Sequence, residues 1–95
     1  MPTLINENTL DKAASMLKAL AHNDRLQIVN LLLQGELNFG EIQRVIGTKQ
    51  SNTSIQLSKL KWCGILKSRW DGNKVYYSLT NDSIKRIVKS IIAGI

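Results

Sequence analysis

The apolar residues of this 95-residue chain change their spacing at Gly64, from a helical repeat to an alternation of two. After Gly64, one alternating run begins at Leu66 and a second ends at Leu79. An Asp-Gly pair at 71–72 lies between the two runs and favours the tight turn of a β-hairpin. We therefore expect one β-hairpin in a chain whose other apolar patterns are helical.

Four segments before the hairpin have apolar residues three or four positions apart, the repeat of a helix that buries one face. Short polar side chains stand where caps are needed, and glycines follow the second, third and fourth segments. The expected helices are 9–20 capped by Asn8 or Thr9, a second capped by Asn23 and ending at Gly35, a third opened by the capping box Asn38–Glu41 and ending at Gly47, and a fourth over about 50–62.

The third and fourth helices are separated only by a short segment at 47–49, the arrangement of a helix-turn-helix. A last helix is expected over 82–95, where isoleucines recur at helical spacing and form a wide apolar face. A helix-turn-helix followed by a hairpin is a winged helix. We therefore expect a mainly α fold with a small β-hairpin, a winged helix-turn-helix of order α-α-α-α-β-β-α, as a single domain over residues 1–95.

Positive charge is concentrated in the middle of the sequence. The formal net charge is +6 for the whole chain, and it divides into −1 over residues 1–48, +5 over 49–74 and +2 over 75–95. A basic zone of this kind attracts polyanions such as nucleic acid. A solvated surface that only keeps the protein soluble is the alternative explanation.

The helix over 50–62 carries most of its polar residues on one side. At 100° per residue, Thr53, Leu57 and Leu60 share a face that should pack inward. Amides and hydroxyls can read base edges in the major groove, an apolar side chain can contact a thymine methyl, and lysines can hold phosphates. On this basis the candidate DNA-contacting residues are Ser51, Asn52, Ile55 and Lys59 in the helix, Lys49 before it, and Arg69 and Lys74 in the hairpin.

Simpler explanations stay open for some of these residues. Helix capping would also account for Gln50, Ser51 and Asn52, and a solvated helix face would account for Lys59. Trp62 has no settled role, because helical geometry points it outward, where a tryptophan is unusual. Covering the base of the hairpin, stacking near its arginine or lying in an interface would each explain it.

The chain offers little other chemistry. Its single cysteine, Cys63, excludes an internal disulfide and a cysteine-cluster metal site, and we expect it to be a small buried apolar residue. Its single histidine, His22, has no partner at a metal-ligand spacing and suits a helix junction or cap. Without paired carboxylates, a nucleophile–base set or a phosphate loop, no enzyme activity, cofactor or metal is expected. No signal peptide or long apolar run is visible, so we expect a cytoplasmic protein with no membrane partner.

The segment from Ala14 to Leu79 resembles the arsenic-repressor (ArsR/SmtB) family of dimeric winged-helix repressors. The matching stretches are LKALAHNDRLQIVNLL at 17–32, GEI at 40–42, QSNTSIQLSKLKWCGIL at 50–66 and KVYYSL at 74–79. The resemblance implies that the helix over 50–60 enters the major groove of an operator. By position, the residues implied to read DNA are Gln50, Ser51, Ser54 and Gln56, of which Gln56 stands where the family often has His.

The same resemblance implies a homodimer held by the first and last helices, 9–20 and 82–95. The isoleucine-rich last helix agrees, because its apolar face is too large for a monomer of this size to leave exposed. Packing of that face within one chain is the alternative. The candidate dimer-interface residues are Leu10, Leu17, Ile84, Ile87, Val88, Ile91 and Ile92.

Together these features predict a sequence-specific double-stranded DNA-binding transcriptional regulator, a dimeric repressor of an imperfect palindromic operator. The alternative is a winged-helix protein–protein interaction module without a direct role in reading DNA. The inducer is unknown, because the family's metal-sensing residues are missing. Asn38 and Gly40 stand in place of its Cys-x-Cys, and residues 83–95 contain no His, Asp or Glu.

Overall fold

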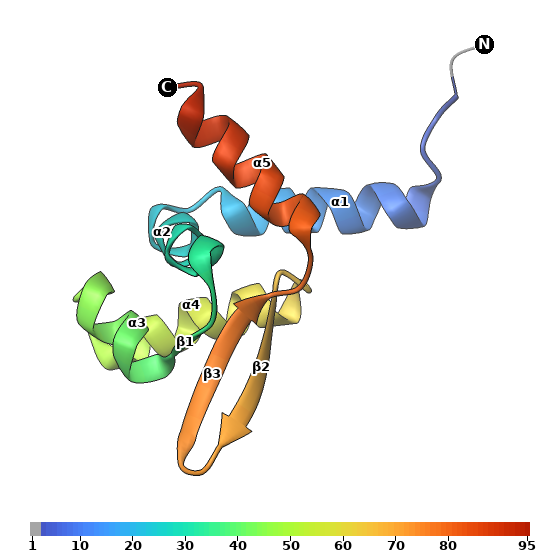
Figure 1. Ribbon diagram of the computed structural model, residues 1–95. Coiled ribbons are helices and arrows are strands. Elements are labelled where there is room, and N and C mark those ends of the chain that lie inside the picture. Colours follow the sequence, from blue (N-terminus) through green and yellow to red (C-terminus); the bar gives the residue numbers. More distant parts are fainter. Residues whose placement is uncertain (1–2) are drawn as a thin grey trace.

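The computed structural model describes residues 3–95 and confirms a winged helix-turn-helix (Figure 1). The elements are, in order, α1 (Glu7–Leu20), α2 (Asn23–Leu31), the 3-10 helix η1 (Leu32–Gln34), β1 (Leu37–Asn38), α3 (Phe39–Ile46), α4 (Gln50–Trp62), β2 (Leu66–Asp71), β3 (Lys74–Leu79) and α5 (Asp82–Ala93). All five expected helices and the hairpin are present, and η1 and β1 are two further elements that the apolar pattern does not predict. Within the described residues, no helix is long and apolar enough to cross a membrane.

Helix α1 begins two residues earlier than expected. Asn6 is its N-cap, and the Asn6 Oδ1 accepts a hydrogen bond from the Thr9 N–H at 2.9 Å. The expected caps, Asn8 and Thr9, lie inside the helix. The polar cluster at the start of this helix contains several residues that could cap, and the sequence alone does not distinguish them.

The caps of α2 and α3 show one wrong and one correct expectation. His22, and not Asn23, caps α2, because the His22 Nδ1 accepts from the Asp24 N–H at 3.2 Å. This bond confirms the expected capping role of the histidine. The capping box of α3 is also confirmed: Asn38 Oδ1 accepts from the Glu41 N–H at 2.9 Å, and Glu41 Oε1 accepts from the Asn38 N–H at 3.0 Å.

The core lies where α2 meets the other helices. Helix α2 packs against α1, α3, α4 and α5, and its residues Ile28 and Val29 are fully buried. Burial of each large aliphatic side chain contributes about 1.5–3 kcal/mol, so these contacts hold the surrounding helices in place. The other buried apolar residues are Ala19, Leu20, Leu32, Ile42, Leu57, Leu60, Ile65, Leu66, Leu79, Ile84 and Val88.

The hairpin belongs to a three-stranded antiparallel sheet of order β1-β3-β2. Strand β1 pairs with β3, with Leu37 opposite Tyr77, and this ties the segment before α3 to the wing. Two residues are too few to show an alternating pattern, which is why this strand was not predicted. In the hairpin Asp71 pairs with Lys74, so the two-residue loop is Gly72-Asn73 rather than the expected Asp-Gly. Gly72 has a φ of +62°, which only glycine adopts readily.

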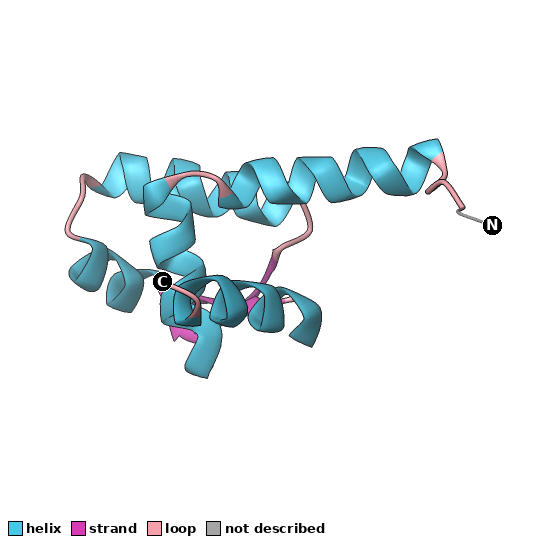
Figure 2. Ribbon diagram, turned by 90° about the horizontal axis from the view of Figure 1, so that it is seen from above, coloured by secondary structure: helices cyan, strands magenta, loops and turns pink. Residues whose placement is uncertain are grey.

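The terminal helices are only partly available to a partner. Ile84 and Val88 are 4% and 0% exposed and pack in the chain's own core, so the expectation that they form a dimer interface is wrong. The N-terminal part of α1 extends beyond the rest of the domain in both views (Figures 1 and 2). The predicted interface residues that do remain exposed are Leu10, Leu17, Ile87, Ile91 and Ile92.

Replacing Asn38 with Ala should lower the free energy of unfolding by about 1 kcal/mol, because the Glu41 N–H loses its cap. For a domain of this size that loss corresponds to a fall of about 4–8 °C in Tm, measured by circular dichroism. The matched control is Asn8→Ala, since Asn8 is exposed inside α1 and caps nothing. Its Tm should stay constant or rise slightly. Equal falls for the two variants would contradict the capping role.

Candidate nucleic-acid interface

Helix α4 has the buried face that its sequence predicts. Thr53, Leu57 and Leu60 are buried, and the helix packs against α2, α3 and β2. The Thr53 hydroxyl lies 3.1 Å from the hydroxyl of Thr48, so this buried polar group has a hydrogen-bond partner. The inward face therefore fixes the rotation of α4 and decides which side chains point outward.

The opposite face of α4 is open to solvent from its first turn onward. Ile55 is 52% exposed in the middle of this face. A half-exposed isoleucine among hydroxyls is consistent with the predicted contact to a thymine methyl. The other exposed residues on or beside this face are Lys49, Gln50, Ser51, Ser54, Ser58 and Lys59.

Gln56 does not lie where a DNA-reading residue must lie. Its side chain is buried, with 6% of the residue exposed. Its Oε1 accepts from Arg25 Nη1 at 2.9 Å, and its Nε2 donates to Asn52 Oδ1 at 3.1 Å. Both ends of the amide are thus bonded inside the domain. The expectation that Gln56 faces DNA is wrong, and its role in this structure is to join α4 to α2.

Asn52 belongs to the same network and is half-buried. Its Nδ2 donates to Asp24 Oδ2 at 3.1 Å and lies 3.3 Å from Thr48 Oγ1. With both ends of its amide engaged, Asn52 has little left to offer a base edge. No pattern in the sequence singles out Arg25 or Asp24 as members of this network. The four-residue spacing of Asn52 and Gln56 was a usable signal, because amides at this spacing meet on a helix surface.

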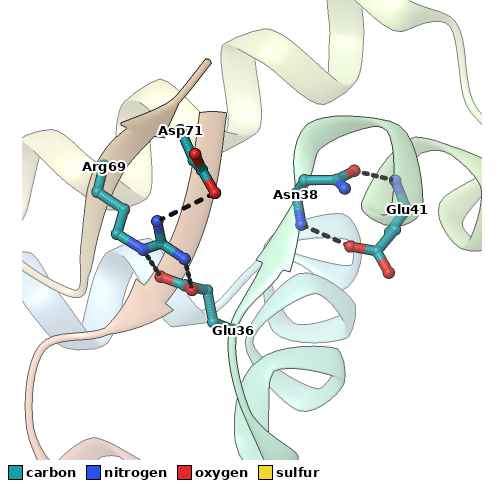
Figure 3. A network of polar contacts seen from close by, with 5 residues as sticks. All are labelled: Glu36, Asn38, Glu41, Arg69 and Asp71. Atoms are coloured by element: carbon teal, nitrogen blue, oxygen red, sulfur yellow. Dashed lines mark hydrogen bonds and ion pairs between the residues drawn. The ribbon is translucent and has the colours of Figure 1, made fainter. Parts of the chain in front are cut away.

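The wing arginine is also bonded within the domain (Figure 3). Arg69 Nη2 donates to Glu36 Oε1 at 2.6 Å and Arg69 Nε donates to Glu36 Oε2 at 2.9 Å, a two-bond pairing. Its guanidinium lies 4.6 Å from the ring centre of Tyr76, and Asp71 Oδ2 lies 4.0 Å from its Nη1. Arg69 is therefore not a free cation for DNA in this structure. Lys74, at the wing tip, remains exposed.

The pairing with Arg69 changes the acidity of Glu36. The hydrogen bonds from Arg69 are the largest cause and hold the pKa of the Glu36 carboxyl below its ordinary value. Desolvation opposes them as the next largest cause, and the charges of Arg69 and Lys67 add smaller effects in the same direction as the hydrogen bonds. The pKa of Arg69 is raised for the same reason. The carboxylate is thus charged and bonded at neutral pH. The contact should weaken only as pH falls through the lowered pKa of Glu36.

The geometry defines a class of protein: a winged helix-turn-helix whose α4 and hairpin lie below α1 and α5 in Figure 1, with a fixed and exposed face on α4. The sequence model of the family described as "Bacterial regulatory protein, arsR family" matches residues 22–68. The chain belongs to this family and is a winged helix-turn-helix transcriptional regulator.

Named relatives span most of the chain. The biofilm growth-associated repressor of Agrobacterium fabrum is 31% identical over 93 residues, which cover 98% of this chain and 80% of the relative. The transcriptional activator HlyU of Vibrio cholerae is 34% identical over 83 residues, covering 87% of this chain and 77% of that protein. A solution structure from Mycobacterium bovis, titled a homodimeric winged helix-turn-helix DNA-binding domain, aligns with a TM-score of 0.84 at 30% identity. That alignment covers 98% of this chain and 88% of the other chain.

Replacing Arg69 with Gln should raise the pKa of Glu36 toward its ordinary value, because the carboxylate loses its two charged hydrogen bonds. A pH titration of the Glu36 side-chain carboxyl carbon by NMR measures this shift. The matched control is Lys67→Gln, which removes a cation that acts on Glu36 only through space. It should raise the pKa less. The same increase in both variants would show that the hydrogen bonds are not the main cause.

Proposed function

We propose that this chain binds double-stranded DNA as a homodimer and acts as a repressor, with α4 of each subunit in the major groove. The observation that supports this most directly is the exposed face of α4. The opposite face of the same helix is buried in the core, so the rotation of α4 is fixed and the exposed side chains point in a defined direction. The N-terminal residues of a recognition helix are those that usually reach base edges. In α4 these are Gln50, Ser51, Ser54 and Ile55.

Exposed cations around this face would hold the phosphate backbone. Lys49 precedes α4, Lys59 lies in its last turn, and Lys74 lies at the wing tip. Such contacts position the protein without reading sequence, and they make affinity fall steeply with salt. Arg69 would join them only after exchanging Glu36 for a phosphate. In the conformation seen here it instead holds the wing to the segment before α3.

The proposed dimer uses the exposed apolar residues of α1 and α5, with residues 1–95 acting as one domain. A homodimeric structural relative supports this assembly. The two α4 helices would then contact half-sites about one helical turn, or 34 Å, apart in an imperfect palindrome.

We propose repression because of the similarity to the Agrobacterium repressor, although one relative is named an activator. We place the protein in the cytoplasm, where its DNA would be, and propose no enzymatic step. These relatives do not favour the alternative of a purely protein-binding module.

Replacing Ser54 with Ala should lower the ratio of specific to non-specific DNA affinity by roughly fivefold, because a base edge loses a hydrogen bond worth about 1 kcal/mol. The measurement is the Kd for a preferred duplex and for a scrambled duplex at the same salt concentration. The control Ser90→Ala removes an exposed hydroxyl on α5 and should leave the ratio unchanged. An unchanged ratio in Ser54→Ala would show that Ser54 does not read the DNA sequence.

Replacing Lys59 with Ala, in contrast, should weaken binding to both duplexes alike and reduce the slope of log Kd against log salt by about 1.

Replacing Ile91 with Asp should shift the protein from dimer to monomer at micromolar concentration, because a carboxylate cannot be buried unpaired in an apolar interface. Sedimentation equilibrium should give a mass near 10.7 kDa for the variant and near twice that for the unaltered chain. The control Ser90→Asp places the same charge at the neighbouring position, about 100° around the helix. It should remain a dimer. If both variants dimerise equally well, α5 is not the interface.

A further inference from the structure

An open groove runs between α1 and the C-terminal half of α4, on a surface that shares only Lys59 with the proposed DNA contacts. Its volume is about 540 Å³, within the range of small-molecule sites. Its lining is mainly apolar, and it carries charged groups from three helices. The lining residues that matter here are Lys18 and Ala19 of α1, Arg25 of α2, and Ser58, Lys59 and Trp62 of α4.

The charged residues in this groove are all cations. Lys18, Arg25 and Lys59 line it, and none of them forms an ion pair with another part of residues 3–95. Arg25 bonds only to neutral oxygens: its Nε donates to the Ala19 carbonyl at 2.6 Å, and its Nη1 donates to Gln56. Three cations facing one concave surface without a carboxylate give it a positive potential that favours an anion.

Trp62 supplies the second feature. It is 92% exposed, which confirms its outward orientation, and it borders both this groove and a smaller hollow that contains Asp11 and Lys12. Cys63 beside it is only partly buried, contrary to expectation. A fully exposed indole next to cations offers a flat apolar surface on which a planar ring can stack. Ser58 adds a hydroxyl that can donate to an oxygen of the same ligand.

We propose that this groove binds a small planar aromatic carboxylate, with the ring stacked on Trp62 and the carboxylate held by Lys18, Arg25 and Lys59. Guanidinium and ammonium donors form the strong, charge-assisted hydrogen bonds that such a carboxylate accepts. A ring supplies the apolar area that an inorganic anion lacks. Both parts of the ligand are therefore needed.

We expect the groove to stay open in the proposed dimer. At 100° per residue, Ser15 and Ala19 on the groove side of α1 lie about 160° around the helix from Leu17. Leu17 belongs to the exposed apolar stripe assigned to the partner subunit. A ligand and a second copy of the chain would thus occupy opposite faces of α1.

Arg25 connects the groove to the first turn of α4. The same guanidinium that lines the groove donates to Gln56, and Gln56 donates to Asn52 in the first turn of the helix. A carboxylate that takes over the Nη1 donor would break the bond to Gln56. It would also neutralise Lys59, a proposed phosphate contact. Ligand binding should therefore weaken DNA binding, a consequence that rests on the proposed function, whereas ligand binding itself does not.

The binding test uses the full chain without DNA and three probes: 1-naphthoate, its neutral amide 1-naphthamide, and acetate. The chain has two tryptophans, so its two indole N–H signals in a ¹H–¹⁵N spectrum report on Trp62 and Trp70 separately. Naphthoate should shift the Trp62 signal saturably, with a Kd below about 1 mM, and leave the wing Trp70 signal in place. Naphthamide and acetate should each bind at least about tenfold more weakly.

Matched variants locate the site. Lys18→Gln and Trp62→Ala change exposed side chains and should each raise the Kd for naphthoate about tenfold. In Trp62→Ala, which lacks the reporting indole, the Kd is read from the backbone N–H signals of the groove residues. Lys89→Gln makes the same charge change on α5, away from the groove, and should leave the Kd unchanged. The site is refuted if naphthoate produces no saturable shift, if acetate or the amide binds equally well, or if Lys18→Gln behaves like Lys89→Gln.

A second measurement tests the link to DNA. Saturating naphthoate should raise the Kd for DNA about fivefold or more in the unaltered chain, and clearly less in Lys18→Gln at the same probe concentration. Binding of naphthoate with no change in DNA affinity would refute the coupling through Arg25. A chain that binds naphthoate but no DNA at all would refute the proposed function and leave the site standing.

Discussion

The packing of α4 against α2 is the contact on which the rest of the structure depends. It combines two kinds of interaction. The buried leucines of α4, Leu57 and Leu60, pack in the core around α2, and a polar chain from Arg25 through Gln56 and Asn52 to Asp24 joins the same two helices. The apolar contacts provide most of the stabilisation between the two helices, because the hydrophobic free energy scales with the apolar area that is buried. The hydrogen bonds add direction, since an unpaired buried amide would cost about 1–3 kcal/mol. As a result α4 has one rotation, and its outward face is defined.

The wing is held by a second polar contact of a different kind. Arg69 and Glu36 are exposed, so their attraction is screened by water and salt, and such pairs add little to global stability. Their two-bond geometry nevertheless fixes the angle of the hairpin relative to the segment before α3, together with the pairing of β1 and β3. Orientation rather than stability is what this pair contributes. The rigid face of α4 and the oriented wing then form one surface.

Much of this could be predicted from the sequence, and the failures have physical causes. Apolar periodicity located all five α-helices, although not the 3-10 helix η1, because burial of one face is a property of the local sequence. Gln56 lies about 60° around the helix from the buried Thr53, and this angle predicts that Gln56 is buried too. The prediction failed because a polar amide was assigned to the solvent-exposed face. Glu36 and Arg69 meet across 33 residues of sequence, a distance at which no local pattern is visible. On α5 the isoleucines form one continuous apolar face. The positions of α2 and β3, against which α5 packs, decide that Ile84 and Val88 are core while Ile91 is exposed.

The measurement that tests the central claim most directly is selection of bound duplexes from a random-sequence pool, followed by footprinting of the enriched sequence. Two fixed α4 helices in a symmetric dimer should enrich an imperfect palindrome. Its two half-sites should be centred about one helical turn apart, with protection in adjacent major grooves. Enrichment of no sequence, or of a single half-site protected by one copy of the chain, would contradict the account of this protein as a dimeric reader of DNA.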